Sequence, residues 1–147
     1  MDDSPLDPIQ KQKVYDSFGR QGLMKTIGGR LVRVERGRVD VELPHSEAIT
    51  QQHGYFHAAA ITAIADNAGG YAALTLMRED EEVVAVEFKI NLLRPAIAQR
   101  LLAQAVVLRA GRTIVTSQIT VSAVLESGSV DVAVMLQTNF RVSEKRG

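Results

Sequence analysis

Hydrophobic and polar residues alternate with a period of two through most of the second half of the chain. The alternation is clearest from Val83 to Leu93, which predicts a β-strand with one buried face. Three more strands are predicted from Arg100 to Arg109, Thr113 to Val124 and Ser129 to Val142, and the short glycine-marked turns between them indicate antiparallel hairpins. The side chains expected on the core face are Val84, Val86, Phe88, Ile90 and Leu92 of the first strand and Val130, Val132, Val134, Leu136 and Phe140 of the last.

The first half of the chain has two weaker patterns. Spaced apolar residues from about Pro8 to Phe18, followed by Gly19, predict a short helix lying over an edge of the fold. From Gly29 to Leu43 the period returns to two, which predicts a hairpin that turns at Arg36-Gly37. The stretch from Pro44 to Phe56 is rich in turn-forming residues, and we expect a loop there.

Almost every residue from His57 to Met77 is apolar or small, so this segment predicts one long helix. Its length would suit a membrane span, but an Asp-Asn pair at the midpoint is costly in hydrocarbon and the glycine pair Gly69-Gly70 weakens the helix. A helix that is hydrophobic on all sides is better explained as one wrapped by protein. We therefore expect an α+β fold in which a curved antiparallel sheet encloses this helix.

Composition narrows the functional classes. The 147 residues suit one compact domain (28–147) preceded by a peripheral helix segment (1–27). The net charge of zero argues against a nucleic-acid partner. The chain has no cysteine, which excludes disulfides, thiolate catalysis and cysteine-bound metals. The N-terminus lacks the basic and apolar regions of a secretory signal, so we expect a cytoplasmic protein without membrane association.

Asp66 is the strongest candidate for chemistry. A carboxylate in the middle of an apolar helix is costly to bury unless it is paired, hydrogen-bonded or protonated. It could line a hydrated subunit interface or cap a backbone amide. Alternatively, it could act as a general base or nucleophile, because burial shifts the pKa of a carboxyl in the way that catalysis uses.

The start of the same helix offers a second catalytic group. The backbone N–H groups around His57, Ala58 and Ala59 lack partners within the helix and could stabilise a developing oxyanion. Ala58 and Asp66 are eight residues apart, which is about 12 Å along a helix. One carbonyl cannot contact both groups on one helix, so we expect a homo-oligomer with sites between subunits.

Other motifs are less specific. His53 and His57 have a spacing that can bind a metal, but no third ligand lies near in the sequence, so we expect structural or substrate-contacting roles and no metal or cofactor. No Gly-x-Ser-x-Gly motif or phosphate-binding glycine loop is present. Arg94 and Arg112 follow or separate predicted strands, and either could contact a phosphate.

The run from Gln51 through Asp66-Asn67, followed by Asn91-Leu92-Leu93-Arg94-Pro95-Ala96, resembles the PaaI-type acyl-CoA thioesterases of the hotdog-fold superfamily. The similarity covers about residues 28–142. It implies a sheet of five or six strands around one helix, dimers joined edge to edge and often paired into tetramers, and hydrolysis of a coenzyme A thioester. The acyl group implied is of medium length or aromatic.

Carried over by position, the resemblance gives Asp66 the role of catalytic carboxylate and gives the Ala58 N–H the role of polarising the thioester oxygen. Gln51 stands where the family usually has an asparagine that places water or the leaving group. Ala58 and Ala59 replace the usual glycine pair. The residues expected to contact substrate are His53, Gly54, His57, Asn67, Arg94 and Arg112. A hotdog enoyl-CoA hydratase or dehydratase and a non-catalytic acyl-CoA-binding module are the alternatives.

Overall fold

The structure is a computed structural model that describes residues 4–143. Its elements in chain order are α1 (Pro8–Gly19), α2 (Gly22–Ile27), β1 (Arg30–Glu35), β2 (Arg38–Pro44), the 3-10 helix η1 (Glu47–Ile49), α3 (Ala58–Leu74), β3 (Glu81–Leu92), β4 (Arg100–Ala110), β5 (Ile114–Leu125) and β6 (Gly128–Ser143). The predicted hairpin, the four later strands and the long helix are confirmed. Helix α2 was not expected from the sequence pattern.

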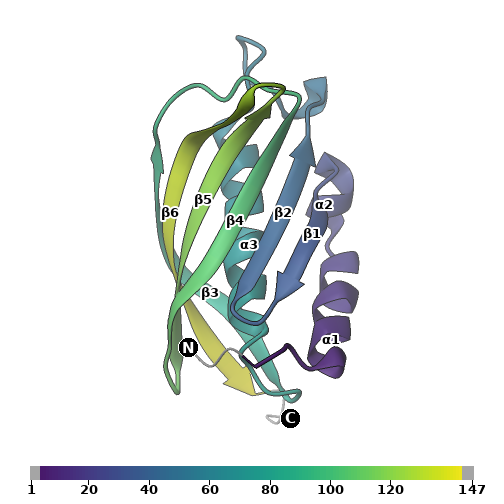
Figure 1. Cartoon of the computed structure of the whole chain (residues 1–147), viewed down its shortest axis with the longest axis vertical. Helices are drawn as coiled ribbons and strands as arrows, with labels where there is room; N and C mark the ends of the chain where they lie inside the picture. Colours follow the sequence, from purple (N-terminus) through teal and green to yellow (C-terminus); the bar gives the residue numbers. More distant parts are fainter. Residues whose placement is uncertain (1–3, 144–147) are drawn as a thin grey trace.

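The six strands form one antiparallel sheet in the order β1-β2-β4-β5-β6-β3. The sheet curves around α3, which lies against its inner face, while α1 and α2 lie beside β1 (Figure 1). This arrangement confirms the expected α+β fold with one central helix. Because β3 follows α3 directly but pairs only with β6, it forms an edge of the sheet.

Small residues on α3 let the sheet approach closely. Ala65, Ala68 and Ala72 have no exposed surface, and Ile64 and Leu74 fill the larger gaps between helix and sheet. The helix begins after His57 and gives way at Thr75, whose hydroxyl donates back to the Ala72 carbonyl (2.6 Å). No helix within residues 4–143 combines the length and the apolar character needed to cross a membrane.

Two β-bulges change which side chains face the helix. In β6, Ala133 pairs with Val121 but Asp131 pairs with Ser122, so Val132 is an extra residue and the alternation shifts by one. Beyond Val132, the odd-numbered residues of β6 from Ala133 to Asn139 are the buried ones, and they face the helix. The expectation that Val134, Leu136 and Phe140 face the core is wrong: all three lie on the outer face, and Leu136 and Phe140 are 50% and 39% exposed.

The second bulge lies in β3, between Ala85 and Glu87. It places Val84 opposite Phe140 on the outer face but Phe88 opposite the buried Gln137 on the inner face. The prediction that the five apolar residues of this strand share one core face is therefore wrong. Phe88 remains 43% exposed although it faces inward, because no further strand covers this edge.

The helices α1 and α2 are tied to the core by one buried apolar residue each, Val14 and Met24. Helix α1 also contacts the connection between α3 and β3, where the Gln10 side chain donates to the Leu74 carbonyl (2.6 Å) and Lys13 forms an ion pair with Glu82 (3.1 Å). The N-terminal helices therefore lie over the same end of β3 that faces the middle of α3. This placement brings them to the candidate site.

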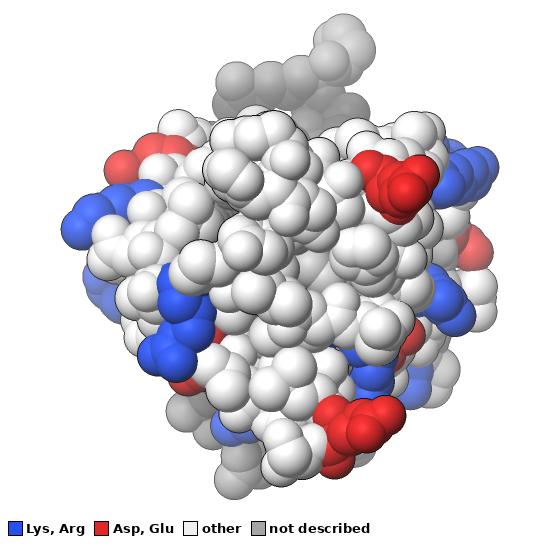
Figure 2. Space-filling model, turned by 90° about the horizontal axis from the view of Figure 1, so that it is seen from above, with Lys and Arg blue, Asp and Glu red and all other residues white. Residues whose placement is uncertain are grey.

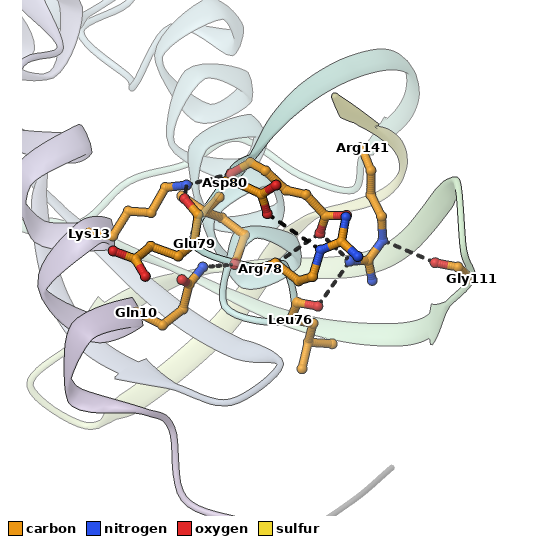
Figure 3. Close-up of polar contacts among 10 residues, drawn as sticks. Gln10, Lys13, Leu76, Arg78, Glu79, Asp80, Gly111 and Arg141 are labelled. Carbon is orange, nitrogen blue, oxygen red and sulfur yellow. Dashed lines mark hydrogen bonds and ion pairs between the residues drawn. The ribbon is translucent and has the colours of Figure 1, made fainter. Parts of the chain in front are cut away.

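A polar network fixes the start of β3. Glu81 is almost buried and accepts the backbone N–H of Arg78 (2.9 Å) and the guanidinium of Arg141 (3.1 Å). Arg141 also donates to the carbonyls of Leu76 and Gly111, so one side chain joins β6, the end of the helix and the β4–β5 turn (Figure 3). The Arg78 N–H, followed by the two guanidinium groups, holds the pKa of Glu81 below its ordinary value.

Candidate active site

Asp66 lies on the side of α3 that faces β6 and β3. Its carboxylate accepts a hydrogen bond from the side-chain amide of Gln137 (2.6 Å). Partial burial raises the pKa of the Asp66 carboxyl, and the Gln137 hydrogen bond acts in the opposite direction. Asp66 is thus a partly desolvated acid held by a neutral donor.

The space in front of Asp66 is a cavity of about 340 Å³. Helix α3, the N-terminal helices and the start of β3 all contribute to its walls. Tyr71 anchors the wall formed by the N-terminal helices, because its hydroxyl is hydrogen-bonded to Ser17 (3.1 Å) and Gln21 (2.9 Å). The lining residues are Ser17, Gln21, Leu23, Asp66, Asn67, Gly70, Tyr71, Glu82, Val83, Ala85 and Asn139.

The N-terminus of α3 presents a single free backbone donor. The His57 N–H donates to the Ile49 carbonyl (2.9 Å), and the Ala59 N–H donates to Nδ1 of the His57 ring (2.9 Å). Among the described residues, no partner accepts the N–H of Ala58, the first residue of the helix. Of the three N–H groups singled out from the sequence, only that of Ala58 is available to a ligand.

Gln51 shapes the loop before this helix. Its side-chain oxygen accepts the backbone N–H groups of His53 (2.5 Å) and Tyr55 (3.3 Å), which closes the turn at Gly54, a residue with a positive φ of 81°. The side-chain NH₂ of Gln51 is left for a ligand. Gln51 and Ala58 line a second cavity, of about 480 Å³, together with His53, Tyr55, Phe56, Ile61, Leu92, Leu93, Arg94, Pro95 and Ala96.

The two candidate catalytic groups therefore lie in different cavities. The Asp66 cavity is bounded by Val83 and Ala85 near the start of β3, and the Ala58 cavity by Leu92 and Leu93 at its end. A single chain brings Gln51, His53 and Arg94 to Ala58, and brings Asn67 to Asp66.

The end of the molecule seen in Figure 2 has an uncharged centre with acidic and basic side chains around its rim.

The other residues predicted from the sequence lie elsewhere. His57 caps α3 through its ring nitrogen, and Gly54 borders a neighbouring cleft of about 610 Å³ that also includes His45. Arg112 is exposed in the β4–β5 turn, outside both cavities. Within residues 4–143, no three His, Asp or Glu side chains come together in a group able to hold a metal ion.

Sequence reasoning missed Gln137 and Asn139, which lie behind Asp66 on β6. Both appear in the sequence as ordinary polar positions of an alternating strand. The phase shift at Val132 turns them inward, and no local signal in the sequence marks that shift.

A six-stranded antiparallel sheet wrapped around one helix, with an acid at mid-helix, defines a hotdog fold of the thioesterase class. A family model described as "Thioesterase superfamily" matches residues 53–124. A solved thioesterase family protein from Silicibacter pomeroyi is 40% identical, with a TM-score of 0.89 over 91% of this chain and 98% of that one. The chain belongs to the thioesterase superfamily and is an enzyme of the thioester-hydrolysing kind.

Other relatives agree. A putative esterase from Saccharolobus solfataricus is 33% identical over 77% of this chain and 79% of its own. A 1,4-dihydroxy-2-naphthoyl-CoA hydrolase from Listeria monocytogenes is 34% identical over 48% of this chain and 57% of its own. The E. coli PaaI protein shares the fold, with a TM-score of 0.82 and 22% identity over 94% of this chain and 96% of that one, which confirms the PaaI-like architecture.

Proposed function

We propose that this protein hydrolyses acyl-CoA thioesters at sites shared between two copies of the chain. Asp66 of one copy acts as general base or nucleophile, and the Ala58 N–H of the other polarises the thioester carbonyl. The acyl-CoA class is supported by the resemblance to PaaI-type enzymes and by the relative named for hydrolysis of an aromatic acyl-CoA. The acyl group proposed is of medium length or aromatic.

One observation carries the proposal: the acid and the free N–H lie at opposite ends of an exposed edge strand. If β3 pairs with β3 of a second copy about a two-fold axis near Phe88, and Val86 stays an extra residue, Leu92 of one copy comes opposite Val83 of the other. The Ala58 cavity of one copy then meets the Asp66 cavity of its partner. Each pair of chains would have two such composite sites.

The surface of β3 supports a second copy as its partner. The strand is 12 residues long, and its exposed side chains include Val84, Val86, Phe88 and Leu92, which are 43–55% exposed. An open apolar edge of this length is a liability that proteins cover or pair. Self-pairing would satisfy the free backbone groups of the edge and place apolar side chains of the two strands beside one another.

The chemistry follows from the two groups. A nucleophile, which is either water deprotonated by Asp66 or the carboxylate itself, attacks the thioester carbonyl carbon. Negative charge collects on the carbonyl oxygen, where the Ala58 N–H and the positive end of α3 stabilise it. The C–S bond then breaks, and coenzyme A leaves as its thiol after taking up a proton. Where Asp66 attacks, water hydrolyses the acyl intermediate to the free acid.

Binding residues come from the same two cavities. We propose that the amide NH₂ of Gln51 and the ring of His53 contact the thioester end of the substrate, while Arg94, which is exposed beside them, meets a phosphate of coenzyme A. Asn67, one residue after the acid, contacts the acyl group in the Asp66 cavity.

The test is thiol release from a panel of aliphatic and aromatic acyl-CoAs by the wild-type protein and Asp66→Asn. Because the chain has no cysteine, a thiol reagent gives no protein background. We expect Asp66→Asn to reduce kcat by about 10²–10⁴-fold, the range for loss of a general base. Asp16→Asn, an exposed acid on α1, is the matched control and should retain full activity.

Each other outcome identifies an alternative. Full activity in Asp66→Asn would contradict the catalytic assignment. Binding of acyl-CoA with no hydrolysis across the panel would favour a non-catalytic binding module. Loss of enoyl absorbance without thiol release would indicate a hydratase.

A further inference from the structure

Gln137 is a polar residue at an unexpected place in the core. It lies on the inner face of β6 beneath α3 and has no exposed surface. Its side-chain NH₂ donates to the Asp66 carboxylate (2.6 Å) and to the backbone carbonyl of Asp66 (3.3 Å). Burying an amide without partners is costly, so a position of this kind is retained only where its hydrogen bonds are satisfied.

Asn139 fixes which way the Gln137 amide points. The Asn139 NH₂ donates to the Gln137 side-chain oxygen (3.2 Å), and Asn139 is also fully buried. If the Gln137 amide turned over, its oxygen would face the Asp66 carboxylate and its NH₂ would face the NH₂ of Asn139. Both contacts would be repulsive, so the carboxylate and the Asn139 NH₂ together favour the orientation in which the Gln137 donor points at the acid.

The helix is shaped to admit this amide. A Cβ at Gly69 would lie 2.0 Å from the Gln137 side-chain oxygen and 2.8 Å from Ile119 Cδ1. Glycine at this position therefore lets Gln137 lie directly against the turn that carries Asp66. Three features, the buried amide, its oriented neighbour and the missing Cβ, converge on one carboxylate.

We propose that Gln137, oriented by Asn139, is a positioning residue that holds the Asp66 carboxylate in one rotamer and favours its ionised form. This inference rests on the proposed function, since it assigns a role to a residue behind the proposed catalytic acid. A neutral donor suits this task, because it stabilises the carboxylate without pairing it to a charge that would make it a weaker base.

Among the groups around Asp66, the Gln137 donor is the main one that opposes the effect of burial on the pKa of the Asp66 carboxyl. From β3, Glu82 is the charged group lining the same cavity, and Lys13 of α1 pairs with it. From α3, Tyr71 is the other titratable group, and from β6 and α1–α2 the lining residues are uncharged. Burial raises the pKa of Asp66 and the Gln137 donor lowers it, so loss of the donor leaves burial unopposed.

The test is the pH dependence of kcat in Gln137→Met, which keeps the side-chain length and removes the donor. Activity requires ionised Asp66, so its rate falls as the pH drops through the pKa of the acid. A hydrogen bond to a charged group is lost, so we expect this acid limb to move up by about one pH unit. We expect kcat at its plateau to fall about tenfold with little change in KM, because the substrate contacts remain.

Ser117→Ala is the matched control. Ser117 is fully buried on β5 opposite Gln137 and also bonds to α3, through the Gly69 carbonyl (3.3 Å), but its hydroxyl makes no hydrogen bond to the Asp66 carboxylate. Its variant should leave the acid limb in place. If Gln137→Met does not fold, Asn139→Ala replaces it, with a smaller shift in the same direction because Gln137 is then free to turn.

A readout without turnover separates this inference from the proposed function. Carbon NMR of the carboxyl groups, with Asp66→Asn to assign the signal, gives the pKa of Asp66 directly, and Gln137→Met should raise it. An unchanged pKa and acid limb in a folded variant would overturn the positioning role. If Asp66→Asn keeps full activity while the NMR shift occurs, the hydrogen bond stands and the catalytic role of Asp66 fails.

Discussion

At the scale of single residues, α3 contains two adjacent glycines with opposite roles. A Cβ at Gly69 would collide with Gln137, whereas a Cβ at Gly70 would meet nothing within 4 Å because it points into the Asp66 cavity. The first glycine is required by packing and the second by nothing in the structure. The pair therefore offers a comparison in which helix propensity is the same and packing differs.

We predict that Gly69→Ala lowers the free energy of unfolding by about 1–3 kcal/mol, since overpacking outweighs the gain in helix propensity. Gly70→Ala should raise it by about 0.5–1 kcal/mol, because the backbone is helical and the methyl group has room. Urea unfolding followed by circular dichroism measures both. Equal stability of the two variants would show that the sheet moves away from Gly69 without cost.

A functional residue could be predicted from the sequence where its polarity differs from that of the residues around it. Asp66 was identified because one acid interrupts an apolar helix, and Ala58 because it begins that helix. Gln137 could not be identified in this way, because a polar residue in an alternating strand is ordinary. Its partner is 71 residues away, and only the folded sheet brings the two together.

At the scale of elements, the helix and strands follow from periodicity, but the faces of two strands do not. A bulge adds one residue and reverses the alternation beyond it, and whether it forms depends on the register with the neighbouring strand. The runs around Val86 and Val132 give no local sign of this. The strands were therefore predicted correctly, while the side chains beyond Val132 and before Val86 were assigned to the wrong face.

The connection between α3 and β3 gives a prediction at this scale. Because the pKa of Glu81 is lowered in the folded state, its stabilising effect is complete above the ordinary glutamate pKa and disappears as the pH falls through the lowered value. We expect Glu81→Gln to lower the free energy of unfolding at pH 7 by about 1–2 kcal/mol, because Arg141 and the Arg78 N–H lose an ionised acceptor.

The check is urea unfolding at several pH values between 7 and 3. The difference from wild type should shrink toward the acidic end, where Glu81 is protonated in both states. Glu79→Gln, an exposed acid in the same connection, is the control and should unfold like wild type throughout. A difference that persisted unchanged at low pH would mean that charge is not the cause.

At the scale of the whole molecule, the proposed site is complete only between two chains. The separation of Ala58 and Asp66 along one helix follows from their numbering and the rise of a helix. The exposed edge at β3 does not, because strand order depends on long-range pairing. The structure thus adds the surface through which two copies would supply each other's missing half.

We predict that two inactive variants restore activity when mixed. Ala58→Pro removes the free N–H, and His57, at φ −67° and ψ 140°, already has the backbone angles that precede proline. Each mixed dimer with Asp66→Asn would have one intact site and one doubly defective site. Equal mixing after unfolding and refolding should give about a quarter of wild-type activity, the value expected for random pairing of two-fold dimers.

Thiol release measures the recovery, and each variant refolded alone is the control. Failure to recover activity, with sedimentation showing that mixed dimers form, would place both groups within one chain. Recovery would show that each site takes Asp66 from one chain and the Ala58 N–H from the other.

The close contact between Gly69 and Gln137 limits which substitutions homologous proteins can carry at these two positions. Position 69 cannot gain a side chain while position 137 stays glutamine in this place, since a Cβ at 69 would lie 2.0 Å from the Gln137 side-chain oxygen. Among homologous sequences, residues larger than glycine at position 69 should appear only together with a shorter residue than glutamine at 137. Two positions far apart in the sequence would then covary.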